Sequence, residues 1–238
     1  MGNAALVTGA GSGIGRALCL RLLADGWTVC AVDRDLAGLP DHPGLLRCIG
    51  DVRVPSTSTD AAARLLATAG RIDALVTCAA IYHVRPFLDL DEELWDETFA
   101  VNTTAGLLAA QAVLPAMRAQ GAGAIVLFSS TLARHGQVGG AHYAASKGAV
   151  LGLARSLALE TAEQGIRVNT VSPGLTDTPQ PRGNMTEAQL RARAHDNPLG
   201  RIGEVSDMVE AVLFLIDADE ASYVTGQDLR VTGGERLF

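Results

Sequence analysis

Short apolar runs alternate along the whole chain with longer segments in which apolar residues recur every three or four positions. Brief, nearly continuous apolar runs are typical of strands buried on both faces of a parallel sheet. The runs predict strands at Ala4–Thr8, Thr28–Val32, Leu45–Ile49, Ala74–Thr77, Ala124–Ser129, Arg167–Val171 and Asp228–Val231.

The segments between these runs have helical periodicity. The pattern predicts helices at Gly13–Asp25, Ser56–Ala69, Glu92–Gln120, Ala141–Gln164, Thr186–His195 and Ser206–Asp217. Alternating strands and helices imply an α/β fold with a doubly wound parallel β-sheet of the Rossmann type and helices on both faces. We expect residues 1–238 to form one domain, with ligands bound at the carboxyl ends of the strands.

Composition and charge narrow the class of partner. The 238 residues carry a net charge of −7, and no run rich in basic residues is present. This balance argues against a nucleic acid or an anionic membrane as a partner. The first strand is expected to begin by Ala4, which leaves no room for a signal peptide, and we expect no apolar run of the ~18 residues that a membrane span needs.

Cysteine and histidine spacing indicates no metal site. The four cysteines lie in separate apolar runs without Cys-x-x-Cys spacing, and the five histidines show no ligand pattern. Scattered thiols of this kind are typical of free cysteines in a reducing compartment. We therefore expect a cytoplasmic protein with neither disulfides nor a structural zinc.

A glycine-rich turn joins the first strand to the first helix. It has the pattern Gly-x-x-x-Gly-x-Gly and comprises Gly9, Ser12, Gly13, Ile14 and Gly15. Glycines permit a tight turn and a close backbone approach to a pyrophosphate, and the following helix offers free N–H groups. The turn predicts dinucleotide binding.

An acidic residue at the end of the second strand indicates which dinucleotide the protein binds. Asp33 follows Gly15 by 18 residues, where a carboxylate accepts both ribose hydroxyls of NAD and repels a 2′-phosphate. The next residue, Arg34, would suit that phosphate, but no basic residue lies within the glycine turn. We expect NAD as the cofactor, with NADP less favoured, and Asp51 and Val52 beside the adenine.

Lys147 is the only lysine in the chain, and it follows Tyr143 by four residues within a predicted helix. Residues at this spacing lie on one face of a helix. A nearby ammonium favours phenolate and lowers the pKa of a tyrosine from its usual value of about 10. The pair therefore predicts a tyrosine that acts as a general acid and base.

With Ser130 thirteen residues before Tyr143, and Pro173-Gly174 after the sixth strand, the chain resembles the short-chain dehydrogenase/reductase family over nearly its whole length. The resemblance implies a catalytic set of Ser130, Tyr143, Lys147 and Asn102. Tyr143 would exchange the alcohol proton, and Ser130 would bind the substrate oxygen. Lys147 would hold the nicotinamide ribose, while Asn102 would anchor a proton-relaying water.

The same resemblance adds cofactor contacts beyond the glycine turn. It places Asn102, Tyr143, Lys147, Pro173, Gly174, Thr176 and Thr178 against the nicotinamide half of the cofactor. After the fourth strand the family usually has Asn-Asn-Ala-Gly, whereas this chain has Thr77-Cys78-Ala79-Ala80. Ala79 matches a cofactor contact, Cys78 replaces an asparagine that ties central strands together, and Ala80 adds a methyl group.

The substrate pocket is less firmly indicated. We expect Tyr82, Ser130, Leu132, His135 and Tyr143 to contact the substrate, with a mobile loop at about 180–197. A largely apolar pocket favours a small hydrophobic or cyclic secondary alcohol or its ketone. A dihydrodiol dehydrogenase that forms a catechol is the main alternative, and a carrier-protein ketoreductase is less favoured. A non-catalytic dinucleotide sensor would not need both Tyr143 and Lys147.

Family resemblance also implies a homotetramer. The helical segments Glu92–Gln120 and Ala141–Gln164 carry more apolar residues than one face of a sheet covers. Such surfaces commonly meet in closed symmetric assemblies.

Overall fold

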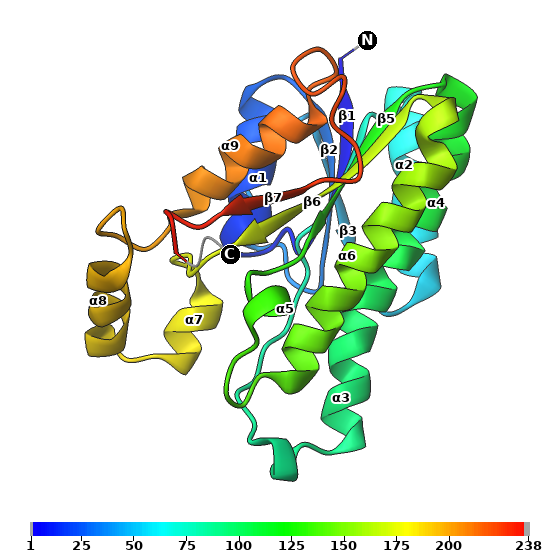
Figure 1. Cartoon of the computed structure of the whole chain (residues 1–238). Coiled ribbons are helices and arrows are strands. Elements are labelled where there is room, and N and C mark those ends of the chain that lie inside the picture. Colours follow the sequence, from blue (N-terminus) through cyan, green and yellow to red (C-terminus); the bar gives the residue numbers. More distant parts are fainter. Residues whose placement is uncertain (1, 236–238) are drawn as a thin grey trace.

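Seven apolar segments pair in parallel to form one sheet in the order β3-β2-β1-β4-β5-β6-β7 (Figure 1). The structure is a computed structural model that describes residues 2–235. The strands are β1 (Ala4–Thr8), β2 (Thr28–Asp33), β3 (Leu45–Ile49), β4 (Ala74–Thr77), β5 (Gly123–Phe128), β6 (Ile166–Pro173) and β7 (Asp228–Val231). This order reverses between β1 and β4, where doubly wound folds bind their ligands.

Helices cover both faces of this sheet, as the strand and helix pattern predicts. Within residues 2–235 the helices are α1 (Gly13–Ala24), α2 (Pro55–Ala69), α3 (Glu92–Phe99), α4 (Ala105–Gln120), α5 (Leu132–His135), α6 (Ala141–Thr161), α7 (Pro179–Asn184), α8 (Glu187–Asp196) and α9 (Val205–Ile216). Of these, α1, α2, α4, α6 and α9 pack against the sheet. Short 3₁₀ turns lie at Phe87–Asp89 and Ala162–Gln164, and a π-helical turn lies at Ala100–Thr104. No helix separates β2 from β3, so the alternation of strand and helix has one gap.

Two apolar cores form on opposite sides of the sheet. On one side, α2, α4 and α6 pack against it through residues such as Leu65, Val113 and Ala154. On the other side, α1 and α9 contribute Leu18 and Val212. Figure 1 shows α1 and α9 on one side of the strands and α2, α4 and α6 on the other. Burial on both faces explains why the strands are nearly continuous apolar runs.

The segment predicted as one helix from Glu92 to Gln120 has three parts. The π-helical turn at Ala100–Thr104 interrupts it, so α3 and α4 are separate α-helices. One extra residue per turn leaves the 3.6-residue periodicity nearly intact, and the sequence pattern does not reveal it. Turns of this kind often occur at functional sites, and Asn102 lies in this one.

By length and composition alone, the segment Glu92–Gln120 could cross a membrane, because an 18-residue stretch within it has a mean hydropathy of 1.3. The sequence reading, which found no such segment, is corrected on this point. The core helix of a soluble protein also passes this test. Val113 and Met117 on this segment are fully buried against the sheet, while Leu107 is 39% exposed on its outer side. The segment therefore has one face packed in the core and a second apolar face outside it.

Candidate active site

Two adjoining cavities lie at the carboxyl ends of the strands. The first, here called the glycine-turn cavity, has a volume of about 540 Å³ and runs along the turn between β1 and α1. The second, the tyrosine cavity, has a volume of about 410 Å³ and lies beside α6. Their linings have five residues in common: Ile14, Cys78, Ala80, Thr178 and Gln180. A ligand that is long enough would therefore reach from one cavity into the other.

The glycine turn is too tight for larger residues. Gly9 has a φ of 69°, and a Cβ there would lie 2.4 Å from the backbone nitrogen of Ala79. A Cβ on Gly15 would lie 2.2 Å from the carbonyl oxygen of Gly9. The side chain of Ser12, the N-cap of α1, makes no capping hydrogen bond, so the first N–H groups of the helix stay available to an anion. The turn thus fits a pyrophosphate.

Asp33 is held at the end of β2 with its carboxylate against the glycine turn. Its Oδ2 accepts a hydrogen bond from Gly11 N at 2.9 Å, and its Oδ1 accepts one from Arg34 N at 2.7 Å. Both Asp33 and Arg34 line the glycine-turn cavity. The carboxylate is thus fixed where the sequence predicts a contact with the adenosine ribose.

A second carboxylate, Asp51, lines the same end of the glycine-turn cavity, together with Arg53 and Glu97. The Arg53 guanidinium bonds to Asp51 at 2.6 Å and reaches Glu97 at 3.4 Å. Arg53 holds the pKa of the Asp51 carboxyl below its usual range. Because these two carboxylates balance the charge of Arg53, Arg34 is the arginine of the described cavity lining that stays available to a phosphate.

Most residues predicted to bind the cofactor line one of the two cavities. Those on the glycine-turn cavity are Gly9, Ser12, Gly13, Ile14, Gly15, Asp33, Asp51, Val52, Ala79 and Thr178. Those on the tyrosine cavity are Tyr143, Lys147, Pro173, Gly174, Thr176 and Thr178. Asn102 lines neither cavity.

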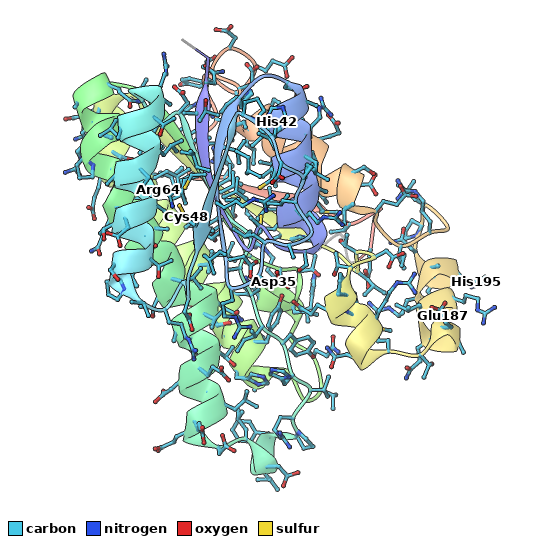
Figure 2. The ribbon with its side chains drawn as sticks, turned by 180° about the vertical axis from the view of Figure 1, so that it is seen from behind. Asp35, His42, Cys48, Arg64, Glu187 and His195 are labelled. Carbon is cyan, nitrogen blue, oxygen red and sulfur yellow. The ribbon has the colours of Figure 1, made fainter. Side chains whose placement is uncertain are left out.

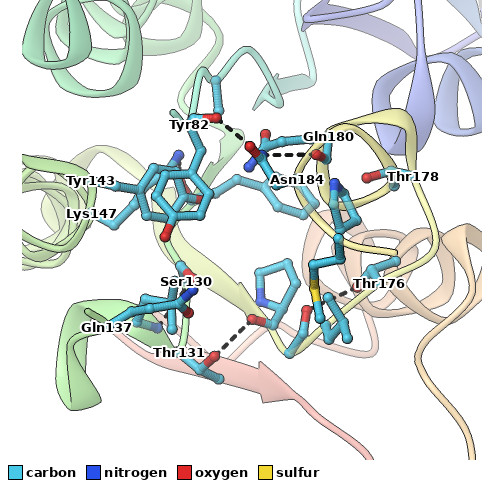
Figure 3. A pocket seen from close by; sticks show the side chains of 18 of the residues that line it. Tyr82, Ser130, Thr131, Gln137, Tyr143, Lys147, Thr176, Thr178, Gln180 and Asn184 are labelled. Carbon is cyan, nitrogen blue, oxygen red and sulfur yellow. Dashed lines mark hydrogen bonds between the residues drawn. The ribbon is translucent and has the colours of Figure 1, made fainter. Parts of the chain in front are cut away.

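Tyr143 lies on the first turn of α6 and is 8% exposed. Figure 3 shows its ring beside that of Tyr82, and the ring centroids are 4.5 Å apart. Burial raises the pKa of the Tyr143 phenol, and hydrogen bonds with Gln180 and Ser130 oppose that rise. The hydroxyl is therefore protonated and lies between the serine predicted to bind substrate and a glutamine of α7.

Lys147 lies one turn further along α6 and is only 2% exposed. Its Nζ donates to the carbonyl oxygen of Phe128 at 2.8 Å and lies 5.9 Å from the centroid of the Tyr143 ring. Burial lowers the pKa of Lys147 to about 8. The sequence predicts that Lys147 lowers the pKa of Tyr143. In this structure burial has the largest effect and raises that pKa, and the groups that oppose the rise are Gln180 and Ser130 rather than Lys147.

Two adjacent serines directly after β5 have different partners. Ser129 Oγ donates to the carbonyl oxygen of Lys147 at 2.8 Å, which fixes α6 to the end of the strand. Ser130 Oγ accepts from Leu132 N at 3.2 Å and lies in the tyrosine cavity, near Tyr143. Both serines border this cavity, but only Ser130 interacts with Tyr143. This placement agrees with the choice of Ser130 from spacing.

Asn102 connects the π-helical turn to two other segments. Its Oδ1 accepts from Ile81 N at 2.8 Å, and its Nδ2 donates to Ile81 O and to Ser146 Oγ, each at 3.1 Å. The amide thus ties the loop after β4 to α6, the helix that carries Tyr143 and Lys147. Because Asn102 lines neither cavity, the structure does not support the predicted contact between Asn102 and the cofactor. That Asn102 anchors a water stays a prediction.

The substrate prediction holds in part. Tyr82, Leu132, Ser130 and Tyr143 line the tyrosine cavity, whereas His135 does not, so its inclusion is corrected. His135 ends the short helix α5, which the sequence pattern does not predict. Gln137 and Glu235 also line the cavity. The sequence did not predict them, because no motif marks residues of such loops.

Cys78 stands where a relative would have asparagine, and it borders both cavities. Its backbone nitrogen donates to Thr8 O at 3.0 Å, so β1 and β4 stay joined without a side-chain amide. Burial raises the pKa of its thiol. No group of three or more potential metal ligands is found within residues 2–235.

The chain is similar to known reductases and dehydrogenases over nearly its full length. A family profile described as enoyl-(acyl carrier protein) reductase matches residues 9–235. The chain is 37% identical to the short-chain reductase protein NovJ of Streptomyces niveus over 98% of this chain and 93% of that protein. It is 36% identical to L-xylulose reductase of Bos taurus over 98% of this chain and 96% of that protein. Its structure matches that of levodione reductase with a TM-score of 0.91 and 29% identity, over 98% and 97% of the two chains.

Proposed function

Because this chain belongs to the short-chain dehydrogenase/reductase family and its relatives are oxidoreductases that act on CH–OH groups, we propose a more specific function for it. In this proposal it uses NAD(H) to interconvert a small hydrophobic or cyclic secondary alcohol and its ketone. The observation that carries the proposal is the burial of Tyr143, Ser130 and Lys147 along one cavity that adjoins the glycine turn.

Tyr143, Ser130 and Lys147 have different roles in the proposed proton transfer. When bound, the nicotinamide supplies or accepts the hydride. Tyr143 gives its phenolic proton to the substrate oxygen during reduction and takes it back during oxidation. Ser130 donates a hydrogen bond to the same oxygen as its charge changes. An ammonium has three donors, so the Lys147 bond to Phe128 leaves two for the cofactor ribose and the proton relay.

Exclusion of water strengthens this chemistry. Tyr143 and Lys147 are almost completely buried, and charges act more strongly on one another where solvent is excluded. The pKa of Lys147, about 8, lies close to working pH, so this residue is able to release and regain a proton during turnover.

We expect NAD to be preferred over NADP because the Asp33 carboxylate is fixed at the end of β2. Replacing Asp33 with Ser removes a charge that repels a 2′-phosphate and leaves Arg34 beside the site, so the preference should shift towards NADP. The measurement is the ratio of kcat/KM for NAD and NADP in both proteins. Asp35→Ser, two residues further on, is the matched control and should leave the ratio unchanged. Better use of NADP by the wild-type protein would contradict this reading of Asp33.

The lining of the tyrosine cavity supports an apolar substrate with one or two polar groups. Leu132, Leu175 and Met185 supply apolar surface, while Gln137 and Asn184 supply amides. A substrate carboxylate is not favoured, because the arginine of the lining, Arg193, is paired with Glu235. Arg182, outside the lining, bonds to Asp177 at 2.5 Å and to Glu187 at 2.6 Å. A lining of apolar and amide side chains fits a secondary alcohol, a cyclic ketone or a dihydrodiol better than a charged acid.

A panel of substrates with NAD and NADH, followed by nicotinamide absorbance, tests the proposed function. It contains aliphatic and cyclic secondary alcohols, their ketones, dihydrodiols, and a 3-oxoacyl thioester because one relative is a (3R)-3-hydroxyacyl-CoA dehydrogenase. We expect turnover of the alcohols and ketones. Exclusive turnover of dihydrodiols would favour the catechol-forming alternative. Binding of NADH without turnover of any compound would favour a dinucleotide sensor.

We also propose that the protein forms a tetramer, because apolar side chains lie exposed on α3 and α4. Trp95, which stacks on Phe99 at 5.0 Å, is 37% exposed, and Leu107 is 39% exposed. Light scattering at micromolar concentration should give four times the mass of the chain. Leu107→Arg should lower that mass, whereas Leu199→Arg, at an exposed site outside these helices, should not. A monomeric wild-type protein would contradict the proposal.

A further inference from the structure

Two cysteines face each other between the sheet and α2, away from the tyrosine cavity. Cys30 lies on β2 and Cys48 on the neighbouring strand β3, and their Sγ atoms are 3.1 Å apart. Both side chains belong to the core under α2. A pair of thiols at this distance needs only a small movement to form a bond, because the sulfurs of a disulfide are about 2.05 Å apart.

A guanidinium group contacts only one of the two sulfurs. Arg64 of α2 donates through Nη1 to Cys48 Sγ at 3.4 Å and to Arg47 O at 3.0 Å. Figure 2 shows Arg64 and Cys48 close together where α2 covers the sheet. A cavity of about 510 Å³ lined in part by Arg64, Arg47 and His42 opens beside this contact. Cys48 is 8% exposed and is not part of this lining, but Arg64 both lines the cavity and contacts the Cys48 sulfur, so a small solute in the cavity comes near the Cys48 side of the pair.

The surroundings make the two sulfurs unequal. The hydrogen bond with Cys30 and the charge of Arg64 lower the pKa of Cys48 to about 7, although burial and Asp60 oppose this change. The same hydrogen bond, together with burial, raises the pKa of Cys30. Burial raises the pKa of Cys19 to about 12 and that of Cys78 as well. Thiolate character is thus concentrated at Cys48, and thiolates are the reactive form of cysteine.

We propose that Cys30 and Cys48 form an oxidant-reactive dithiol, in which Arg64 activates Cys48 and Cys30 resolves the oxidised product into a disulfide. The oxidant is a hydroperoxide, of which hydrogen peroxide is the simplest. This proposal does not depend on the proposed oxidoreductase function, because its chemistry involves neither Tyr143 nor the nicotinamide cofactor.

Atoms and electrons balance in the two proposed steps, which are oxidation of Cys48 and formation of the disulfide. The Cys48 thiolate attacks one oxygen of hydrogen peroxide, the O–O bond breaks, and a sulfenic acid and hydroxide form. The Cys30 thiol then attacks the sulfenic sulfur, the S–O bond breaks, and a disulfide and water form. The hydroxide takes up a proton, so two thiols and one peroxide give one disulfide and two waters. The thiols lose two electrons and the peroxide gains them.

The strand register determines what closing this bond would do. Cys30 pairs with Leu46, and Cys48 pairs with Val32, so the two cysteines are diagonal neighbours. Diagonal closure draws β3 along β2, and β3 is able to yield because it is an edge strand bonded on one side only. A bond under this strain should be readily reduced by a dithiol. Asp33 and Asp51 each follow one of these cysteines by three residues, so the shift would reach the glycine-turn cavity.

Peptide mass spectrometry of the wild-type protein tests the proposal without any substitution. The protein is treated with hydrogen peroxide at pH 7, quenched, alkylated under denaturing conditions and digested. We expect a Cys30–Cys48 disulfide that dithiothreitol reverses, while Cys19 and Cys78 remain alkylated. Equal or faster oxidation of Cys19 or Cys78, or overoxidation of Cys48 without the disulfide, would overturn the proposal.

Variants separate the role of each group. Cys30→Ser should leave Cys48 as a sulfenic acid that dimedone traps, and Cys48→Ser should abolish peroxide consumption. Arg64→Gln should slow disulfide formation by roughly threefold or more, since a higher thiol pKa is only partly offset by greater nucleophilicity. An unchanged rate in Arg64→Gln would overturn the activation of Cys48 by Arg64. Circular dichroism of each variant confirms that the fold is intact.

Discussion

Tyr143→Phe should lower kcat by about 10²–10⁴-fold while NADH binds nearly as well as to the wild-type protein. The substitution removes the hydroxyl that exchanges a proton with the substrate and keeps the ring packed against Tyr82 at 4.5 Å. The measurement pairs steady-state turnover with a titration of NADH fluorescence. Separate values for chemistry and binding show whether the hydroxyl acts on the reaction itself.

Tyr82→Phe is the matched control for this prediction. It removes a neighbouring hydroxyl that is buried and has no hydrogen-bond partner within residues 2–235. The control should therefore keep most of the wild-type turnover. Equal losses in the two variants would mean that the aromatic pair contributes packing alone, and the assignment of Tyr143 as acid and base would fail.

Lys147→Arg should reduce turnover by roughly 10²-fold and weaken NADH binding at the same time. The side chain is almost fully buried, and its Nζ donates to Phe128 O at 2.8 Å, so a planar guanidinium fits neither the space nor the geometry. Displacement of a catalytic group by about 1 Å is enough for a loss of this size. Wild-type turnover in Lys147→Arg would show that the only lysine of the chain is not catalytic.

Lys147→Met separates the charge from the shape of this side chain. Alcohol oxidation needs the Tyr143 phenolate, so its rate rises with pH through the pKa of the phenol. Burial already raises that pKa, and loss of a neighbouring ammonium should raise it further. The rising limb of the oxidation profile should therefore move to higher pH. A limb that moves to lower pH, or does not move, would contradict the electrostatic role of Lys147.

The strands were predictable because each is buried on both faces and therefore appears as a continuous apolar run. Four of the seven have the predicted ends, and the others, β2, β5 and β6, differ by one or two residues at one or both ends. The bounds of the helices were harder to predict, because hydrophobic periodicity does not reveal an added residue in a helical turn. The π-helical turn at Ala100–Thr104 is the example, and the short helices α5 and α7 also lack a periodic signal.

In the site, prediction succeeded where the chemistry is local in sequence. The glycine turn and the Tyr143–Lys147 pair each lie within a few residues, so helix and turn geometry alone bring their members together. His135 and Gln180 lie on the short helices α5 and α7, whose positions depend on packing between distant segments. The pKa of Tyr143 depends on burial, which a spacing pattern does not contain.

Transfer of deuterium tests the central claim most directly, namely that the tyrosine cavity carries out hydride transfer to a carbonyl carbon. The protein is incubated with the ketone panel and NADH that carries deuterium on the reactive face of the nicotinamide ring, and the products are analysed by mass spectrometry. We expect one deuterium on the carbinol carbon of the alcohol, transferred about 10²–10⁴-fold more slowly by Tyr143→Phe. Oxidation of NADH without deuterium in any alcohol, or transfer undiminished in Tyr143→Phe, would contradict the account.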